Sequence, residues 1–475
     1  MTINSESFEG EKRSSFRCPT SANAILRVTN GISSRAHEFP IFVINLSDGG
    51  IGFLFNNSKI EKIDSGVIKF NSLTKPSVEV KGRFAWIDNV REPNQFRCGF
   101  QFDEVDFQRL LDIRRIAWSN DDFINSYVRA ALGTMKLVDD LKDEVFTFFS
   151  NEVRNFVRYM VQLNDSSIRK GAYFSAESQR IFDDLCDKSL ERGFKIVSEV
   201  DSKATIMNIK NLFRNIVGPW VYQGIIVKDA FLKPRGYPGD YRTLERIYDN
   251  KVISTGVGVF SEEYFLKNNY AYGVQQRKNH MKEILSLFLN ENQIHSAKIL
   301  NIACGSCREI KELLDEPIRS NREVIFTCVD HDQEALSFVK ENIDKGIRKF
   351  HFRYIKDNIV NFTKDPKKYF DLFGTQDLIY SIGLIDYLPD RVLKQLLGFL
   401  YALVVPNGKL LVTHKDKEIG KFSALAPDWF CDWRFVPRSK NEIHNLIAES
   451  GLKDYSIINY NLPSTPILFL EIKKR

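Results

Sequence analysis

The sequence predicts a multidomain protein with a small β-barrel, an α-helical middle region and a C-terminal α/β domain built on a largely parallel sheet. Three patterns lead to this prediction. Short β-rich runs separated by turn residues fill residues 1–115, apolar residues recur at helical spacing over residues 116–296, and strand and helix patterns alternate over residues 297–475. A chain of 475 residues has room for these three parts, because domains usually span about 100–200 residues.

The composition is that of a globular chain, with 43% hydrophobic and 27% charged residues. A net charge of +6 is small for 475 residues and gives no reason to expect DNA as a partner. No apolar run approaches the roughly 18 residues of a membrane span, and the N-terminus lacks the apolar core of an export signal. The seven cysteines are scattered and odd in number, which fits reduced thiols and a cytoplasmic location.

Cys304 and Cys307 form a C-x-x-C sequence, for which a redox pair or a zinc site is one interpretation. No second C-x-x-C and no histidine pair follows at the spacing of zinc ligands. We therefore expect no metal ion.

The first 115 residues alternate between β-rich runs and turn residues at a regular spacing, which is typical of a small barrel or sandwich. Strands are expected at Ala24–Thr29, Phe39–Asn45, Ile51–Phe55, Gly66–Phe70, Ser77–Trp86 and Gln95–Phe102.

Two short motifs in this segment suit a nucleotide ligand. Arg13 and Arg17 form R-x-x-x-R before the strands, and Asn45 begins an N-x-S-x-x-G sequence that follows a strand. Arginine forks can pair with phosphates or with the O6/N7 edge of guanine. Ser47 adds a short polar group, and Gly50 permits close approach of a ligand to the backbone.

These motifs, with G-R-F-A-W at 82–86 and C-G-F-Q-F at 98–102, resemble the PilZ domain family. PilZ domains bind cyclic di-GMP, a bacterial second messenger. Asn45 stands where the motif usually has an acid. A PilZ fold that binds nothing remains an alternative. The resemblance implies that the nucleotide-binding residues are Arg13, Arg17, Asn45, Ser47 and Gly50.

The middle region, 116–296, has apolar residues at helical spacing from Phe123 onward. Helix breaks are expected at Asn164–Ser166 and near Asp201–Lys203, and a helix over Ile206–Phe231 is expected to be interrupted by Gly218-Pro219. Two interpretations of this region are open. It connects the domains and forms a homodimer, or it caps a substrate site, and one region could do both.

Residues 233–241 interrupt the helical pattern with two prolines and two glycines, which predicts a loop that carries charged and aromatic side chains. A second polar and aromatic segment, Tyr270–Arg277, comes just before the C-terminal domain.

The C-terminal domain begins with an apolar strand, Ile299–Ile302, a tight loop at Ala303–Ser306, and a second strand that ends on Asp330. Such a loop brings backbone N–H groups to a helix N-terminus, and an acid at a strand tip can hold ribose hydroxyls. Of the G-x-G-x-x-G set that a pyrophosphate requires, only Gly305 is present.

This stretch resembles motifs I and II of class I methyltransferases that use S-adenosylmethionine (SAM), although Ala303 and Cys307 stand where many members have glycine. The segment Asp377–Gly383 resembles motif IV. Strands at Lys409–His414, Asp454–Tyr460 and Pro466–Ile472 would complete a Rossmann-like seven-stranded sheet. The resemblance implies that SAM is bound by Asn301, Ala303, Cys304, Gly305, Ser306, Asp330, His331, Asp357, Asn358, Ser381 and Gly383.

Three segments, KPRGYPGDYRTLERIYD from residue 233, Y-G-V-Q-Q-R-K from 272, and 431–438, resemble bacterial methyltransferases that make 3-hydroxypalmitic acid methyl ester, a signalling lipid. A carboxylate acceptor is ionised near pH 7 and needs no general base. His414 could serve as the base for a hydroxyl or amine acceptor. The residues expected to orient a carboxylate are Tyr387, Tyr237, Arg235 and Arg438.

The sequence thus favours a SAM-dependent methyltransferase that acts on a small or lipid-like acceptor and is regulated by cyclic di-GMP. Two alternatives remain open. One is a methyltransferase that acts on a protein or on another small molecule. The other is a cyclic di-GMP effector or scaffold with a catalytically silent methyltransferase fold.

Overall fold

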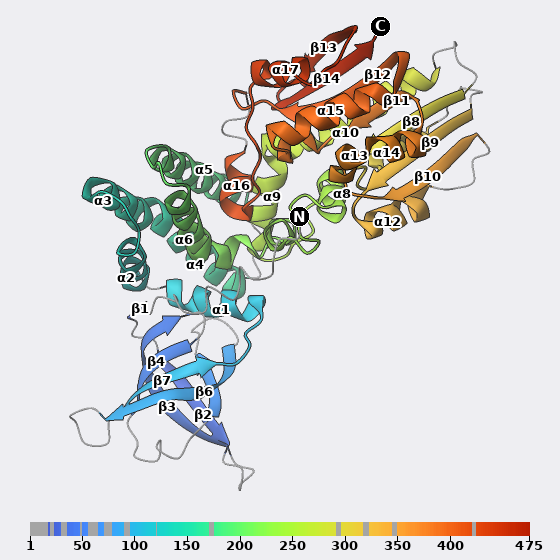
Figure 1. The fold of residues 1–475 in the computed structure, drawn as a ribbon. Coiled ribbons are helices and arrows are strands. Elements are labelled where there is room, and N and C mark those ends of the chain that lie inside the picture. The colour runs from blue at the N-terminus through green and yellow to red at the C-terminus, as the bar shows by residue number, and fades with distance from the viewer. Residues whose placement is uncertain are drawn as a thin grey trace. The chain divides into compact units, whose positions relative to one another are not determined.

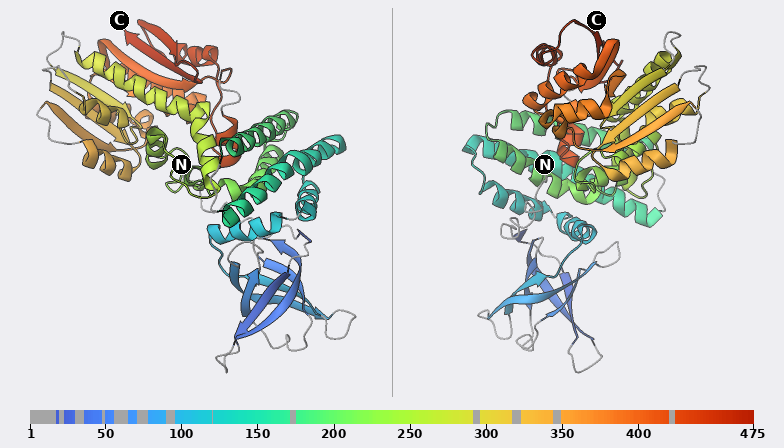
Figure 2. Two further views of the ribbon diagram at one scale, coloured as in Figure 1. Left: turned by 180° about the vertical axis from the view of Figure 1, so that it is seen from behind. Right: turned by 45° about the vertical axis from the view of Figure 1, so that its right-hand side comes forward.

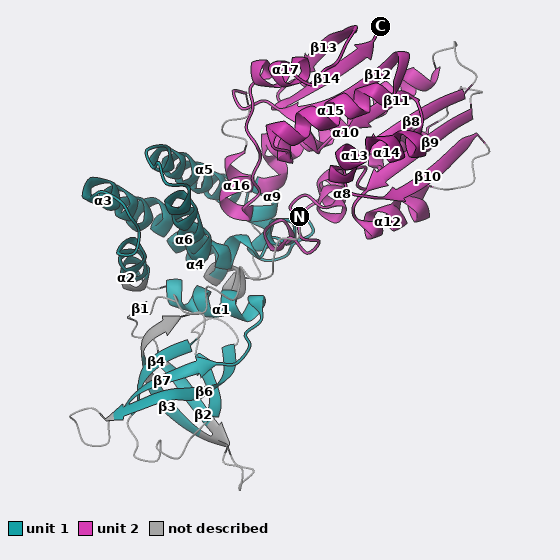
Figure 3. Cartoon of the chain, in the orientation of Figure 1, with its two compact units in different colours: residues 1–228, 253–264 teal, residues 229–252, 265–475 magenta. Residues whose placement is uncertain are grey.

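The computed structural model describes residues 18–19, 23–29, 36–47, 50–55, 65–70, 78–89, 96–119, 121–170, 175–290, 296–316, 323–343, 349–419 and 424–475 (Figure 1). The chain forms two compact units (Figure 3). Unit 1 is Met1–Lys228 with Ile253–Tyr264, and unit 2 is Asp229–Val252 with Phe265–Arg475. The predicted middle region, 116–296, is therefore divided between the two units. None of the described helices is long and apolar enough to cross a membrane.

The N-terminal part of unit 1 is a closed antiparallel barrel. Its strand order is β1-β3-β2-β5-β6-β7-β4, and an additional pairing between β3 and β4 closes the barrel, with the short β1 paired to β3 beside it. Each of the six predicted strands is present. The strands are β1 (Cys18–Pro19), β2 (Asn23–Thr29), β3 (Ala36–Ser47), β4 (Gly50–Phe55), β5 (Ser65–Phe70), β6 (Val78–Asn89) and β7 (Phe96–Phe102).

The barrel closes around alternating apolar side chains, because successive residues of a strand face opposite sides of the sheet. Leu26, Val43, Phe53, Ile68 and Phe100 are all buried in its interior. Since closure pairs every long strand on both sides, the barrel has little exposed strand edge.

The rest of unit 1 is helical. It contains α1 (Phe107–Trp118), α2 (Asp121–Leu132), α3 (Asp139–Phe148), a π-helical turn at Phe149–Val153, α4 (Arg154–Lys170), α5 (Ala176–Ser198), α6 (Lys203–Val221), and parts of α7 (Ile225–Leu232) and α9 (Gly258–Lys267). The break predicted near 201–203 is present, and Ser202 caps α6 by accepting a hydrogen bond from the Thr205 N–H at 3.3 Å. The break predicted at 164–166 is wrong, because α4 continues through it.

The predicted interruption at Gly218-Pro219 is also displaced. Helix α6 continues to Val221, and the break falls before α7 begins at Ile225. A proline within a helix leaves the carbonyl four residues earlier without its usual N–H partner. That carbonyl belongs to Asn215, and it accepts a hydrogen bond from the indole N–H of Trp118 at 3.0 Å. A side chain from α1 thus makes the proline tolerable.

Unit 2 is built on a seven-stranded sheet with the order β10-β9-β8-β11-β12-β14-β13. The first five strands in this order are parallel, and β14 is antiparallel to both β12 and β13. The strands are β8 (Ser296–Ile302), β9 (Glu323–Asp330), β10 (Phe350–Lys356), β11 (Gln376–Ser381), β12 (Val404–Lys415), β13 (Tyr455–Asn461) and β14 (Ile467–Lys474).

Helices cover both faces of this sheet, so unit 2 has three layers (Figure 2). One face packs against α13 (Val360–Lys364), α14 (Pro366–Phe373), α15 (Asp390–Leu403) and α17 (Lys440–Ala448). The other packs against α10 (Asn269–Asn290), α11 (Arg308–Leu314) and α12 (Gln333–Ile343). The strand order changes direction between β8 and β11, where open α/β sheets place their ligand sites. The unit also contains α8 (Tyr241–Asp249), the 3₁₀ turn η5 (Ile385–Tyr387) and α16 (Leu425–Cys431).

Candidate functional site

The loop after β8 has an unusual backbone. Ala303, Gly305 and Cys307 have φ angles of 53°, 54° and 48°, in the left-handed region. Residues other than glycine are uncommon there, because the Cβ atom crowds the backbone. Ala303 and Cys307 therefore keep the turn that glycines would make with less strain.

Asp330, at the end of β9, ties this loop to the neighbouring strand ends. Its carboxylate is 5% exposed and accepts hydrogen bonds from the N–H groups of Gly305 and Asp332, both at 2.9 Å. The Asp330 carbonyl accepts the Asp357 N–H at 3.0 Å, which brings the end of β10 alongside. The ends of three parallel strands thus converge on Asp330, two of them through its carboxylate and the third through its backbone carbonyl.

Two of the predicted cofactor residues brace this site through contacts within the protein. The Ser381 hydroxyl donates to the Ile302 carbonyl at 2.8 Å, which joins the ends of β11 and β8. The Asn301 amide donates to Glu309 Oε1 at 3.1 Å beneath the loop. Gly383 is half-buried and lies so close to Arg277 that a Cβ atom there would be 2.9 Å from its guanidinium.

Asp357 follows β10 and is held by polar neighbours. The Tyr369 hydroxyl donates to Oδ2 at 2.5 Å, and the Asn361 amide donates to Oδ1 at 2.7 Å. Burial acts to raise the pKa of Asp357, but these hydrogen bonds outweigh it and lower the pKa. Asn358 is exposed, and its side-chain oxygen accepts the Val360 N–H at 3.0 Å.

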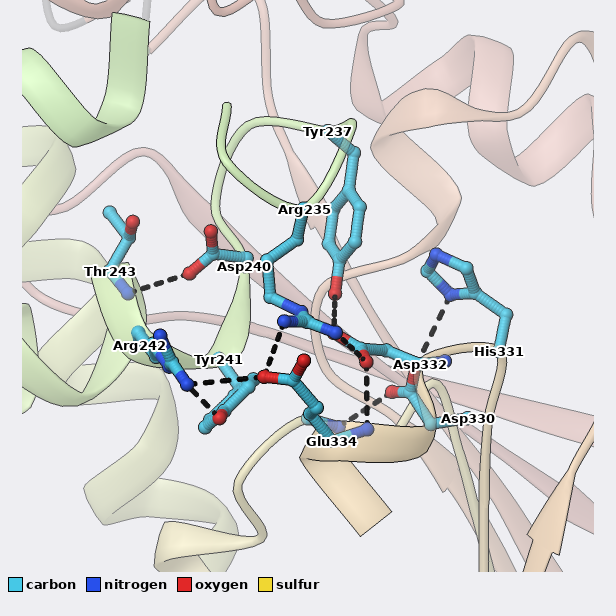
Figure 4. A network of polar contacts seen from close by, with 11 residues as sticks. Arg235, Tyr237, Asp240, Tyr241, Arg242, Thr243, Asp330, His331, Asp332 and Glu334 are labelled. Atoms are coloured by element: carbon cyan, nitrogen blue, oxygen red, sulfur yellow. Dashed lines mark hydrogen bonds and ion pairs between the residues drawn. The ribbon is translucent and has the colours of Figure 1, made fainter. Parts of the chain in front are cut away.

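The predicted loop 233–241 is present between α7 and α8, and its charged side chains contact the end of β9 (Figure 4). Arg235 pairs with Asp332, with Nη2 2.5 Å from Oδ1, and with Glu334, with Nη1 2.5 Å from Oε2. The Tyr237 hydroxyl lies 3.5 Å from Asp332, and its ring lies 4.7 Å from that of His331.

These contacts bear on the predicted role of Arg235. The hydrogen bond to Asp332 raises the pKa of Arg235. Burial acts to raise the pKa of Asp332, but its bond to Arg235 outweighs burial and lowers that pKa. His331 hydrogen-bonds Asp330, which raises the histidine pKa. Arg235 and Tyr237 therefore organise the residues that follow Asp330, and Arg235 already has two carboxylate partners.

The three segments that carry the lipid-methyltransferase resemblance meet in unit 2. Lys233 Nζ lies 3.0 Å from Asp432 Oδ2, and the Gln275 amide donates to the Ile247 carbonyl at 2.9 Å. Just before the second segment, the Tyr270 ring lies 5.2 Å from that of Trp433. Gly239 packs against Trp433 so closely that a Cβ atom would lie 2.3 Å from the indole. The Tyr270–Arg277 segment forms the first turns of α10.

Tyr387 lies beside this cluster. It accepts a hydrogen bond from the Trp433 indole N–H at 2.7 Å, and its side chain is 36% exposed. Its ring is 5.5 Å from that of Phe435. Tyr387 is therefore placed by protein contacts on one side and reaches the surface on the other.

His414 and Arg438 are buried in structural contacts. His414 Nε2 lies 2.9 Å from the Arg438 carbonyl, and Nδ1 lies 2.8 Å from Asp386 Oδ1. A carbonyl oxygen can only accept a hydrogen bond, so Nε2 must carry a proton. This nitrogen therefore cannot remove a proton from the substrate that receives the methyl group. Arg438 donates to Asp390 and to the carbonyls of Ile385 and Leu388. These contacts give no support to His414 as a base or to Arg438 as a carboxylate ligand.

In the barrel, Arg13 and Arg17 lie outside the described residues, as do the side chains of Asn45 and Ser47. The backbones of Asn45 and Ser47 pair with Gly52 and Gly50 of β4. A Cβ atom on Gly50 would lie 2.4 Å from the Phe100 carbonyl oxygen, so strand packing alone requires a glycine there.

The C-x-x-C cysteines contact a third thiol. Cys304, Cys307 and Cys328 are all buried, and Cys307 Sγ lies 3.7 Å from Cys328 Sγ. Across the part of the chain that the structure describes, no group of three or more histidine, cysteine or acidic residues could hold a metal ion.

Sequence reasoning missed several residues that shape the site. Asp332 and Glu334 come two and four residues after Asp330, so their position was a usable signal. Arg277 lies in the polar and aromatic segment 270–277 but was not singled out there, and Lys415 gave no signal in its strand.

Comparisons with known proteins give one family match, which covers the N-terminal part of the chain. Residues 11–117 match the PilZ domain. No curated protein is significantly similar to the chain. Beyond the PilZ domain, SAM-dependent methyltransferases occur among the solved structures that resemble this chain, at low sequence identity and low TM-scores.

Three of these similar structures illustrate the range of coverage and TM-score. A possible exported protein from Bordetella parapertussis has a TM-score of 0.38 and 12% identity, covering 71% of this chain and 99% of that one. Magnesium protoporphyrin IX methyltransferase from Synechocystis PCC 6803, with bound SAH, has a TM-score of 0.35 and 12% identity, covering 53% and 100%. The N-methyltransferase NodS from Bradyrhizobium japonicum has a TM-score of 0.29 and 12% identity, covering 42% and 96%.

Proposed function

We propose that unit 2 is a SAM-dependent methyltransferase and that the PilZ domain binds cyclic di-GMP to regulate it. The observation that carries the first part is the buried Asp330 carboxylate, which receives the Gly305 N–H from the loop after β8. It lies at the carboxyl ends of the parallel strands, beside the change in strand order. The strand order of this sheet, with the antiparallel pair β13 and β14 at one edge, also supports a class I methyltransferase.

The residues at this edge fit SAM. Each carboxylate oxygen of Asp330 has two lone pairs, so it can accept ribose hydroxyls in addition to the two N–H groups it already holds. We assign Asp357 and Asn358, at the end of β10, to the adenine end of the cofactor, where Asp357 would accept from the amino group. The loop at 303–306 and Gly383 would face the methionine part. SAM supplies an electrophilic methyl group when bound, and the protein must align the acceptor with it and exclude water.

For the acceptor, we propose a small, fatty-acid-like molecule that ends in a carboxylate, with a hydroxyl acceptor as the alternative. Support comes from the meeting of residues 233–241, the start of α10 and residues 431–438, which carry the resemblance to lipid-ester methyltransferases. Aromatic side chains dominate this cluster, so it suits an apolar ligand with one polar end.

Calorimetric titration with SAM tests the cofactor site. Asp330→Asn keeps the size of the side chain but removes its charge and half of its acceptors. We expect SAM affinity to fall by roughly 1–3 kcal/mol, because buried ribose hydroxyls would lose their partners. Asp371→Ala, at an exposed aspartate on α14, is the matched control and should bind like the wild type.

Unchanged SAM affinity in Asp330→Asn would place the site elsewhere. Absence of SAM binding by the wild type would favour the silent-scaffold alternative. Mass spectrometry of a lysate incubated with labelled SAM then identifies the acceptor.

A further inference from the structure

Lys415, the last residue of β12, is buried, and its Nζ atom forms no ion pair with any residue that the structure describes. Its side chain is 5% exposed, and Nζ lies 3.5 Å from the ring centre of Tyr270 and 3.3 Å from that of Phe435. Within the described part of the chain, Nζ has no hydrogen-bond acceptor. Aromatic faces attract a cation but do not replace the hydrogen bonds that an ammonium loses on burial.

A second buried cation lies nearby. Arg277, on α10, is 7% exposed, and its guanidinium lies beside Gly383 at the end of β11. Its Nε atom also has no acceptor among the described residues. Arg277 is close enough to Lys415 to repel its charge.

One carboxylate, that of Asp386, is shared in this region, and it already faces His414 and accepts the Lys415 backbone N–H at 2.8 Å. Burial lowers the pKa of Lys415 well below its usual range, with Asp386 opposing the shift and Arg277 adding to it. Two buried basic groups therefore face one engaged carboxylate. The Arg277 guanidinium also hydrogen-bonds the Tyr248 side chain, which leaves only Nε without an acceptor among the described residues. A buried basic group whose hydrogen bonds are incomplete is costly, and sites that carry one often serve a ligand.

We propose that Lys415 and Arg277 form a binding site for one carboxylate group of a ligand. The site lies beside Gly383 at the ligand-binding edge of the sheet, and the partly exposed Tyr387 adjoins it through Tyr270 and Phe435. A carboxylate here would accept charge-assisted hydrogen bonds from both cations. The proposed function supplies the two sources: the amino-acid carboxylate of SAM, or the carboxylate of a fatty-acid-like acceptor.

Lys415→Met tests the proposal, because it keeps the side-chain volume and removes the charge. Titrations use S-adenosylhomocysteine, 5′-methylthioadenosine, which lacks the carboxylate, and octanoate or octanol added with saturating S-adenosylhomocysteine. We expect a roughly 10- to 150-fold loss of affinity for the ligand whose carboxylate occupies the site, and none for its carboxylate-free partner. Lys417→Met, at an exposed lysine paired with Glu442 at 2.8 Å, is the control and should change nothing.

The pattern of losses identifies the source. Loss for S-adenosylhomocysteine but not methylthioadenosine assigns the cofactor carboxylate, and loss for octanoate but not octanol assigns the acceptor. Unchanged affinity for both carboxylates overturns the proposal. If the wild type binds neither nucleoside, the proposed methyl transfer fails, and octanoate, titrated alone, still tests the carboxylate site.

Stability separates this role from a structural one. Removing a buried, unpaired cation should leave the thermal midpoint of Lys415→Met unchanged or raised. A lowered midpoint with normal carboxylate affinity would show that Lys415 only supports the fold. Arg277→Met is the second variant, and it should weaken binding of the same ligand.

Discussion

Glu309 shows how one residue couples the loop after β8 to the core of unit 2. It is 3% exposed, and its Oε1 atom accepts hydrogen bonds from the Asn301 amide at 3.1 Å and the Tyr380 hydroxyl at 2.8 Å. Burial raises the pKa of Glu309 to about 7, and the bond from Tyr380 opposes the shift. The residues below the loop are therefore hydrogen-bonded to a carboxyl group whose pKa is about 7.

This pKa predicts a loss of stability with rising pH. The folded pKa of about 7 lies above the ordinary value of 4.5, so the unfolded chain gives up its proton first as pH rises. The contribution is fully present below pH 4.5 and is lost as pH rises through 7. A shift of about 2.5 units corresponds to about 3 kcal/mol.

Glu309→Gln removes the titration and should flatten the fall in unfolding free energy between pH 5 and 8. Urea unfolding at several pH values measures this free energy. The control is Glu341→Gln, at an exposed position on α12. Parallel pH profiles for wild type and Glu309→Gln would contradict the prediction.

At the scale of elements, α6 illustrates how a helix tolerates an internal proline. Pro219 cannot donate to the Asn215 carbonyl, and the Trp118 indole of α1 donates instead. The contact joins two helices about 100 residues apart in sequence, so a strong local breaking signal is overridden by tertiary structure.

A double-mutant cycle measures this compensation. Trp118→Phe should leave the buried Asn215 carbonyl without a donor and cost roughly 1–3 kcal/mol of unfolding free energy, in addition to lost packing. Pro219→Ala restores a backbone N–H that can donate to the same carbonyl. The double variant should therefore lose less stability than the single variants predict when added. Additive losses would show that the indole bond does not substitute for the helical one.

At the scale of the molecule, the chain joins a PilZ domain to a separate compact unit that carries the candidate methyltransferase site. Regulation between them requires that cyclic di-GMP bind two arrangements of the protein with different affinities, since a ligand with equal affinity for both shifts nothing.

We expect Arg17→Ala to abolish cyclic di-GMP binding, because the nucleotide phosphates lose a pairing partner, and to leave SAM affinity unchanged. In the wild type, a coupling of about 1–3 kcal/mol would change SAM affinity roughly 5- to 150-fold when the nucleotide is bound. Calorimetry of each ligand with and without the other measures both effects. Lys81→Ala, exposed on β6, is the matched control.

Equal heats from wild type and Arg17→Ala would remove Arg17 from the nucleotide site. Nucleotide binding without any change in SAM affinity would leave the PilZ domain a receptor that does not regulate this site.

Local pattern determined much of this protein. The six barrel strands, the 233–241 loop and the position of Asp330 at a strand end all follow from the spacing of apolar and turn residues, which the chain encodes within a few residues. The PilZ motifs were likewise visible in sequence, and the domain match agrees with them.

Tertiary structure decided which side chains meet. Arg235 reaches Asp332 across 97 residues, and Trp118 reaches Asn215 across another 97. Lys415 is buried against α10 although its own strand gives no sign of a ligand. Charge pairing and burial depend on three-dimensional distance, which periodicity along the chain does not specify, so the roles of polar residues could be assigned only once the fold had brought them together.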